Sequence, residues 1–306
     1  MKIQNRSRIC MCVSAAIMVL ALVLSLFGMG INYGIDFAGG LNIQYNMGAA
    51  FEQSDVEEAL KAQGLSEYAI STSGENGHTV QIRVPQLADD EEIQNLQNGL
   101  EAALIEKYPT MDTATATASY VGPIAGKVLV KNAILSVVLA AALMLLYIAF
   151  RFDLASGLAA VIGLMHDVLI MLSFMVILRN VVQMNSSFIA AMLTIVGYSI
   201  NNTIVIFDRI RENKAKADYA GLDRAALASI SVKECLGRTI NTTLTTLTTI
   251  IVLYVLGVAA IREFSLPIIV GILSGVYSAN FLNGYVWAIL EEYRLSHKGA
   301  KKAKKA

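Results

Sequence analysis

The chain has 306 residues, of which 55% are hydrophobic and 16% are charged. Soluble domains usually have a charged share of about 25%, so this composition excludes an ordinary soluble protein. The 24 basic and 24 acidic residues balance, which predicts no general affinity for nucleic acid. Motifs of nucleotide-binding loops, zinc proteases and serine hydrolases are missing from the sequence, and its three cysteines lack zinc-site spacing. We therefore expect no ATP-driven mechanism, cofactor or metal in this chain.

An apolar run at 9–29 is the first element, and its length suits a helix that crosses a bilayer. Lys2, Arg6 and Arg8 precede it, as basic residues do in a secretory signal peptide. The run is longer than the apolar part of a signal peptide, which has about 7 to 15 residues, and no small-residue cleavage site follows it. We interpret it as a retained membrane anchor.

Residues 31–128 follow, and their patterns are those of a folded domain. Leu41, Ile43 and Tyr45 alternate with polar residues, as in a half-buried strand. The predicted elements are, in order, a strand at 41–47, a helix at 54–63, strands at 68–72 and 79–84, a helix that begins at Asp89, and a strand at 113–121. This order is that of an α+β ferredoxin-like (βαββαβ) domain.

Local signals predict the ends of these elements. Ser54 with Glu57, and Asp89 with Glu92, match the capping box that opens a helix. A glycine-rich stretch at 74–77 is expected to turn the chain between the second and third strands.

Five further apolar stretches follow, and each is long enough to cross a bilayer. They lie at 132–150, 154–178, 186–207, 239–256 and 266–290. Lysine and arginine gather in both tails and at 208–238, whereas the opposite short loops hold only Arg179 and Arg262. The positive-inside rule therefore predicts cytoplasmic termini and an extracytoplasmic domain. The expected fold class is a six-span helical membrane protein with this domain between its first two spans.

The predicted division of the chain separates its charges. The parts are the tail and first span at 1–30, the outer domain at 31–128, the bundle at 129–290 with its cytoplasmic loop at 208–238, and the C-terminal tail at 291–306. The outer domain carries four basic and fourteen acidic side chains, and the cytoplasmic pieces carry seventeen basic and eight acidic ones. The basic side suits anionic lipid headgroups, and the acidic domain suits solvent or translocating chains.

His166 and Asp167 lie near the middle of the third span. Ionisable residues are costly to bury in a membrane, so they usually form a buried pair or line a transport pathway. One interpretation of this pair is a proton-carrying or gating site. The other is a structural pair that a neighbouring helix satisfies, and the sequence favours neither.

The fourth span carries polar residues at helical spacing. Thr194, Tyr198, Asn201 and Asp208 fall on one face, with Asn202 beside it. Two adjacent amides are hard to explain against lipid, so we expect them to point into the bundle. Simple hydrogen bonding between helices, worth about 0.6 kcal/mol on average in membranes, competes with a functional role.

Polar and small residues also pattern the last two spans. Arg238 opens the fifth span, and Asn241 and several threonines continue the stripe. We expect Arg238 to face inward, although its side chain could instead extend to the lipid headgroups. In the sixth span, Gly271 and Gly275 form a GxxxG motif, which predicts a close-packing helix face.

Three stretches of sequence carry a resemblance to a known family. They are GIDFAGG at 34–40, VGYSINNT at 196–203 with FDRIREN at 207–213, and Arg238-Thr239 before the threonine-rich fifth span. With six spans and one large first outer loop, they make the chain resemble the SecF proteins of the SecD/SecF export family, in the RND-like superfamily. The resemblance covers essentially the whole chain, and the motif in the fourth span is the most specific.

This resemblance implies a non-enzymatic subunit in the bacterial cytoplasmic membrane. It implies a SecD partner, association with the SecYEG translocon, and use of the proton motive force to move preproteins outward after the ATP-dependent step of SecA. Arg238 matches the membrane arginine of the family. Asn202 stands where many members have aspartate, and an amide cannot release a proton in the working pH range.

Three alternatives follow for the missing carboxylate at position 202. The titrating group lies in the SecD partner, or Asp167 or Asp208 takes part, or the coupling ion differs. The resemblance favours the first, because family members have an aspartate in the equivalent SecD helix.

The resemblance also gives a role to the segment after the first span. Gly34, Gly39 and Gly40 permit tight turns and positive φ angles, and Asp36 could anchor such a turn. Together with Phe37 they form either a hinge that passes membrane motion to the outer domain or a plain connector. The hinge interpretation depends on the resemblance.

Two other functions are alternatives. A small RND-type exporter of lipids or drugs is less favoured, because such exporters usually have twelve spans and two outer domains. In a structural scaffold, the polar groups of the membrane part would only lock the bundle together.

Overall fold

The computed structural model describes residues 3–73, 77–84 and 90–303. The chain divides into two compact units. The helical unit consists of Met1–Ile31, Ser136–Arg179 and Ser187–Ala306, and the α/β unit of Asn32–Leu135 and Asn180–Ser186. The short loop between the third and fourth membrane helices therefore groups with the α/β unit, an association that no local sequence pattern suggests.

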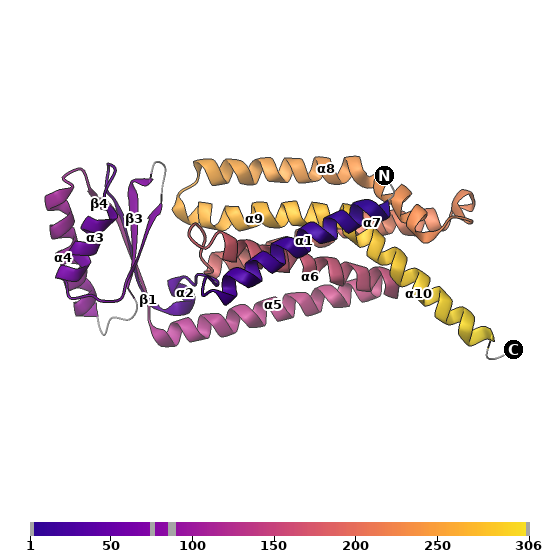
Figure 1. Ribbon diagram of the computed structural model, residues 1–306, viewed down its shortest axis with the longest axis horizontal. Coiled ribbons are helices and arrows are strands. Elements are labelled where there is room, and N and C mark those ends of the chain that lie inside the picture. Colours follow the sequence, from indigo (N-terminus) through magenta and orange to yellow (C-terminus); the bar gives the residue numbers. More distant parts are fainter. Residues whose placement is uncertain (1–2, 74–76, 85–89, 304–306) are drawn as a thin grey trace. The chain divides into compact units, whose positions relative to one another are not determined.

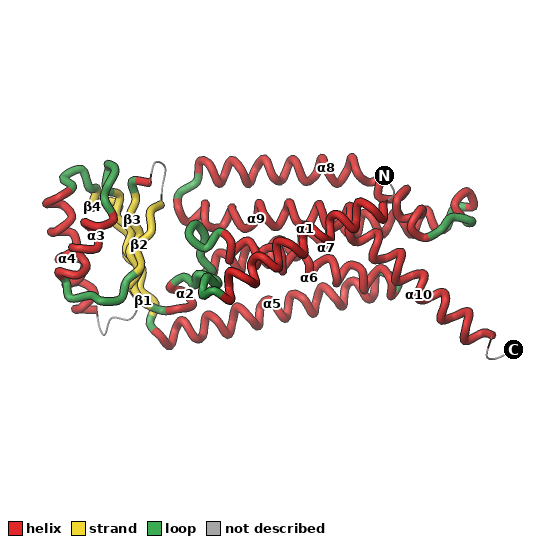
Figure 2. The backbone as a smooth tube through the Cα atoms, in the orientation of Figure 1, coloured by secondary structure: helices red, strands yellow, loops and turns green. Residues whose placement is uncertain are grey.

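The α/β unit has the predicted ferredoxin-like fold. Its elements are, in order, β1 (Gly40–Asn46), α3 (Gln53–Ala62), β2 (Ala69–Ser73), β3 (Thr79–Val84), α4 (Asp90–Lys107) and β4 (Asp112–Val121). The strand order is β2-β3-β1-β4, and all neighbouring pairs are antiparallel. Figure 2 shows both helices on the same face of the sheet. The predicted capping residue Asp89 and the turn residues 74–76 lie outside the described part of the chain.

Alternation along the strands builds the core of this unit. Leu41, Ile43 and Tyr45 of β1 are buried, and they belong to one apolar cluster with Leu100 and Leu104 of α4. Full burial of such a side chain contributes about 1.5–3 kcal/mol relative to exposure. The intervening polar residues of β1 point to the other face of the sheet.

The predicted capping box at Ser54 is wrong. Helix α3 begins one residue earlier, and its N-cap is Glu52, whose side chain makes no cap hydrogen bond. The Glu52 amide instead donates to the hydroxyl of Tyr108 at 3.0 Å, and this hydroxyl donates to Asp55 at 2.6 Å. Tyr108, which follows α4, thus caps the start of α3. Such a distant partner cannot be read from a local pattern.

Six helical spans in the described chain are long and apolar enough to cross a membrane, as predicted. They are α1 (Ile3–Leu26), α5 (Pro123–Arg151), α6 (Leu154–Ile177), α7 (Ser186–Lys214), α8 (Arg224–Leu256), and a last span made of α9 (Ala259–Tyr277), the π-helix η3 (Ser278–Asn283) and α10 (Gly284–Ala303). The last span changes direction between α9 and α10 (Figure 1). The π-helix between them is a usual cause of such a bend.

Two helices continue beyond the predicted spans. Helix α7 runs to Lys214 and α8 begins at Arg224, whereas the predicted spans end at 207 and begin at 239. The added turns are polar and carry ion pairs, such as Arg209 Nε to Glu234 Oε2 at 2.7 Å. Apolar length marks only the part of a helix inside the hydrocarbon, so the helix itself ends later.

The GxxxG face of α9 packs closely against α7. A Cβ atom on Gly271 would lie 2.4 Å from Cγ1 of Ile195, and one on Gly275 would lie 3.2 Å from Cβ of Ser199. Because these positions carry no side chain, the two helices approach each other at this point. This contact holds α7 and α9 together beside the buried carboxylate of Asp167.

Candidate functional site

The carboxylate of Asp167, on α6, is completely buried within the helical unit. Three serine hydroxyls surround it: Ser199 donates to Oδ2, Ser274 to Oδ1 at 2.7 Å, and Ser278 to Oδ2 at 2.8 Å. A buried carboxylate needs such donors because its desolvation is costly. The serines come from α7, α9 and η3, so only the packed bundle brings them together. The sequence did not identify them as site residues.

His166 extends this network toward α1. Its Nδ1 atom lies 3.1 Å from Oδ1 of Asp167, and its Nε2 atom lies 2.7 Å from Oγ of Ser14. Ser14 lies 2.8 Å from the hydroxyl of Tyr277, which donates to the backbone carbonyl of Cys10. The pair predicted from the sequence is therefore one section of a polar chain through the apolar bundle.

The polar residues of α7 point in two directions. Asn202 and Ser199 are buried, but Asn201 and Thr194 are exposed on the surface of the chain. The expectation that both amides face the interior is therefore wrong for Asn201. Successive residues of a helix are rotated by about 100°, so adjacent amides cannot share one face. The Asn202 side-chain nitrogen is buried and has no hydrogen-bond partner among the described residues.

Arg238 of α8 is exposed within this chain, contrary to the inward-facing prediction. Two contacts between α7 and α8 show which residues of α7 lie level with Arg238. The hydroxyl of Tyr198 donates to Thr243 at 3.1 Å, and the thiol of Cys235 donates to the carbonyl of Val205 at 3.7 Å. The two helices therefore run antiparallel. Arg238 lies between the two contacts, level with Asn201 and Asn202 of α7.

Arg238, Asn201 and Asn241 together form what we call the outer polar patch. All three are exposed, and none has a side-chain hydrogen bond or ion pair within the part of the chain that the structure describes. The neighbouring threonines differ, because Thr242 and Thr245 donate to carbonyls of their own helix. Among the polar residues of this region, those of the outer polar patch therefore lack a hydrogen-bond or ion-pair partner within the described chain.

Asp208 is engaged in ion pairs near the end of α7. Its Oδ2 atom accepts from Arg151 at 2.9 Å, and its Oδ1 atom lies 3.1 Å from Nη2 of Arg211. This geometry separates Asp208 from both Asp167 and the outer polar patch, and it favours a structural ion-pair role.

The glycine-rich junction enters the α/β unit through the short helix α2 (Ile35–Ala38). The amide of Phe37 donates to the carbonyl of Gly34 at 3.1 Å as this turn begins. Gly39 and Gly40 follow with φ angles of 77° and 108°. Side chains are strained in this left-handed region, so these two positions require glycine.

The loop between α6 and α7 is hydrogen-bonded to this junction. The amide of Gly34 donates to the carbonyl of Met184 at 3.0 Å, and the amide of Met184 donates to the carbonyl of Asn32 at 2.8 Å. Oδ2 of Asp36 accepts from the amide of Ser186, the first residue of α7, at 2.8 Å. Asp36 therefore anchors a segment 150 residues away in sequence instead of its own turn.

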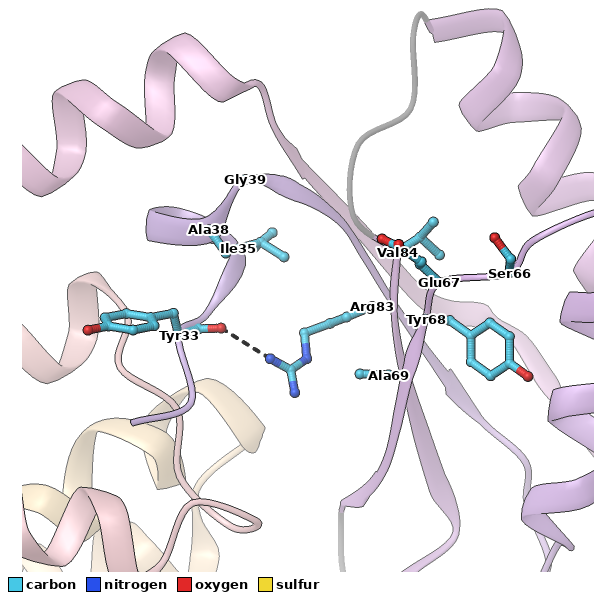
Figure 3. Close-up of a pocket in the computed structure, with 10 residues that line it drawn as sticks. All are labelled: Tyr33, Ile35, Ala38, Gly39, Ser66, Glu67, Tyr68, Ala69, Arg83 and Val84. Carbon is cyan, nitrogen blue, oxygen red and sulfur yellow. Dashed lines mark hydrogen bonds between the residues drawn. The ribbon is translucent and has the colours of Figure 1, made fainter. Parts of the chain in front are cut away.

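A pocket of about 390 Å³ lies beside the junction, within the α/β unit (Figure 3). Arg83 of β3 reaches across it toward the junction. Its Nη1 atom donates to Oδ1 of Asn32 at 3.0 Å and to the carbonyl of Tyr33 at 3.2 Å. The guanidinium thus ties the junction to the sheet.

The described residues contain no group of three or more His, Cys, Asp and Glu side chains that could hold a metal ion.

Comparison with known proteins identifies the family. The family model described as "Protein export membrane protein SecD/SecF, C-terminal" matches residues 101–293, and the "SecD/SecF GG Motif" model matches residues 24–47. The first match alone covers more than half of the chain. The chain belongs to the SecD/SecF family. The second match contains the glycine-rich junction described above.

Curated relatives place it on the SecF side of this family. The protein translocase subunit SecF of Endomicrobium trichonymphae is 32% identical over 275 residues, which are 88% of this chain and 84% of that protein. The SecF subunit of Sebaldella termitidis is 34% identical over 295 residues, which are 94% and 91% of the two chains.

The chain also matches part of larger SecDF proteins. A crystal structure of SecDF, a translocon-associated membrane protein from Thermus thermophilus, superposes with a TM-score of 0.80 and 32% identity over 94% of this chain. The match covers only 38% of that protein. The chain therefore spans little more than a third of this SecDF protein.

Proposed function

We propose that this chain works with a SecD-like partner as the SecF-type subunit of a protein translocase, and that the proton motive force drives it. The relatives that it matches along most of their length are named protein translocase subunit SecF. SecDF relatives carry the names of both subunits, which supports a SecD-like partner. In this proposal both termini are cytoplasmic and the α/β unit lies outside the membrane.

The outer polar patch is the observation that carries this proposal. A charged side chain in a membrane helix is costly unless it is paired, and Arg238, which opens the fifth span, is exposed without a partner in the described chain. An acidic side chain on a partner helix, level with Arg238, would pair with it. Such a carboxylate would also supply the titratable group that Asn202 cannot supply.

The remaining partners follow from the same proposal. The SecYEG translocon would hold the preprotein, SecA would perform the ATP-dependent step, and this chain with its partner would act later. Anionic lipids would contact the basic cytoplasmic side. Gly34, Asp36, Phe37, Gly39 and Gly40 would connect movement in the membrane to the α/β unit.

Replacement of Arg238 by methionine tests the proposal. The Arg238→Met chain keeps an unbranched side chain at this position but removes its charge. We expect normal co-purification with the SecD-like partner and an approximately tenfold loss of the export that a proton gradient stimulates in vesicles, about 1.4 kcal/mol. Lys233→Met is the matched control, because it removes a charge from the same helix outside the patch and should leave export unchanged.

Other outcomes favour other functions. Loss of assembly with the partner in Arg238→Met favours a scaffold. Normal assembly with unchanged export contradicts any role of Arg238 in coupling. If the parent chain purifies as a self-dimer with bound lipid and its depletion leaves secretion unchanged, the RND-type exporter replaces the translocase subunit.

A further inference from the structure

The polar chain between Cys10 and Asp167 has a defined direction. A backbone carbonyl only accepts, so the hydroxyl of Tyr277 donates its single proton to Cys10. In the 2.8 Å contact between Ser14 and Tyr277, the serine is therefore the donor. Ser14 then has no proton left for its 2.7 Å contact with His166. Nε2 of His166 must carry a proton and donate it to Ser14.

The other imidazole nitrogen of His166 faces the carboxylate of Asp167. Nδ1 lies 3.1 Å from Oδ1, and two acceptors without a proton would repel each other at this distance. One proton therefore lies between them, on Nδ1 or on Oδ1. Together the two side chains hold one proton more than a carboxylate and a neutral imidazole would. The pair is uncharged as a whole, as its burial in a membrane bundle favours.

We propose that His166 and Asp167 form a proton-binding site, at which one proton is held between the imidazole and the carboxylate and is released during the working cycle. This inference rests on the proposed proton-driven function and gives the chain a titratable group of its own despite Asn202. The three serine donors permit release, because they continue to stabilise the carboxylate after the proton has left.

The neighbouring side chains do not compete with His166 and Asp167 for this proton near neutral pH. The other titratable side chains in the network belong to Tyr277 of α9 and Cys10 of α1, and a phenol or a thiol in water loses its proton only in alkaline solution. Helices α7 and η3 contribute the uncharged Ser199 and Ser278. Within the described residues, the one ion-pair contact of Asp167 is with His166.

Proton occupancy is also linked to contacts between helices. The relay joins Ser14 of α1, His166 of α6 and Tyr277 of α9. After release the neutral imidazole keeps one proton, and the carboxylate of Asp167 holds it on Nδ1, because two bare acceptors would repel there. Nε2 is then a bare acceptor that faces Ser14 until Ser14 and Tyr277 reorient. Release of the proton therefore weakens the contact of α1 with α6, and loading restores it.

Nitrogen NMR of the imidazole tests this site directly. The chain, labelled with ¹⁵N-histidine and reconstituted with its SecD-like partner in phosphatidylethanolamine and phosphatidylglycerol vesicles, has three histidines, and His166→Gln assigns the relevant signal. We expect one titration step for His166 in the parent, and loss or displacement of this step in Asp167→Asn. A His166 signal that shows no titration from pH 5 to pH 9 would overturn the proposal.

Tyr277→Phe tests the direction of the relay. It keeps the aromatic ring, which lies 5.7 Å from that of His166, and frees Ser14 to donate to an unprotonated Nε2. We expect proton binding to weaken about tenfold, the effect of one hydrogen bond. Ser25→Ala is the matched control, because this α1 hydroxyl donates to the Ala21 carbonyl of its own helix at 2.8 Å. Equal titration of the parent and Tyr277→Phe contradicts the proposal.

Export measurements separate this inference from the proposed function. If Asp167→Asn assembles with the partner and keeps full gradient-dependent export, the proton site is wrong and the proposed function stands. If His166 titrates as expected but export by the parent is independent of the gradient, the proposed function is wrong and the site stands. Because Tyr277→Phe leaves the carboxylate in place, it remains informative even if Asp167→Asn fails to fold.

Discussion

At the scale of single residues, the structure gives Asp55 a role that its sequence position conceals. Asp55 accepts from the hydroxyl of Tyr108 at 2.6 Å and from Nζ of Lys107 at 3.2 Å. The hydrogen bond from Tyr108, and then that from Lys107, holds the pKa of Asp55 below its usual range. The same bond raises the pKa of Tyr108. Asp55 thereby joins the start of α3 to the end of α4.

Asp55→Asn should therefore destabilise the α/β unit in a pH-dependent way. Because the folded pKa is lowered, the stabilisation is fully present above the unfolded pKa of about 4 and is lost as the pH falls through the lowered value. Thermal unfolding should show the variant melting below the parent near pH 7, with the two converging as the pH falls below the lowered pKa of Asp55. Glu57→Gln, which removes an exposed pair with Lys61, is the control. A constant difference at every pH would refute this account.

At the scale of elements, the contact between α7 and α9 positions the serines around Asp167. Gly271→Val adds a side chain where Ile195 already lies, and overpacking of this kind costs about 1–3 kcal/mol. We expect a lower unfolding temperature in detergent. Gly237→Ala on α8 is the matched control, because no atom outside its own helix backbone lies within 4 Å of the added Cβ. Equal loss of stability in both variants would show that close packing is not the cause.

At the scale of the whole molecule, the chain itself links the membrane helices to the α/β unit through three routes. They are the junction after α1, helix α5, which continues from the α/β unit into the helical unit, and the loop at 180–186, which connects α6 to α7 and is bonded to the junction. Helix α6 carries Asp167 and α7 carries Ser199, so displacement of either helix acts on this loop. We propose that the junction and this loop move together and act as a hinge.

The bond between Asp36 and Ser186 offers a test of this linkage. Asp36→Ala removes the acceptor, and Ser186→Pro removes the donor at a first helical position where proline is tolerated. Loss of a helix cap costs about 1 kcal/mol, so both variants should assemble but export less under a proton gradient. Ser186→Ala keeps the backbone donor and should export normally. Different behaviour of Asp36→Ala and Ser186→Pro would argue against the linkage.

The sequence alone determined the six spans, the order of strands and helices in the α/β unit, the glycine-rich junction and the family resemblance. These features depend on length, periodicity and motifs within one segment, and each is readable from neighbouring residues. It also marked His166 and Asp167, because charge is conspicuous in an apolar span.

Only the tertiary structure decided which polar groups meet. Ser14, Ser199, Ser274 and Ser278 are ordinary residues of four separate segments until packing directs them at one buried pair. The same packing leaves Arg238 exposed, although the sequence pattern predicted that it faces inward. A helix shows its own periodicity, but which neighbour covers each face depends on how distant segments pack, and no local pattern contains that information.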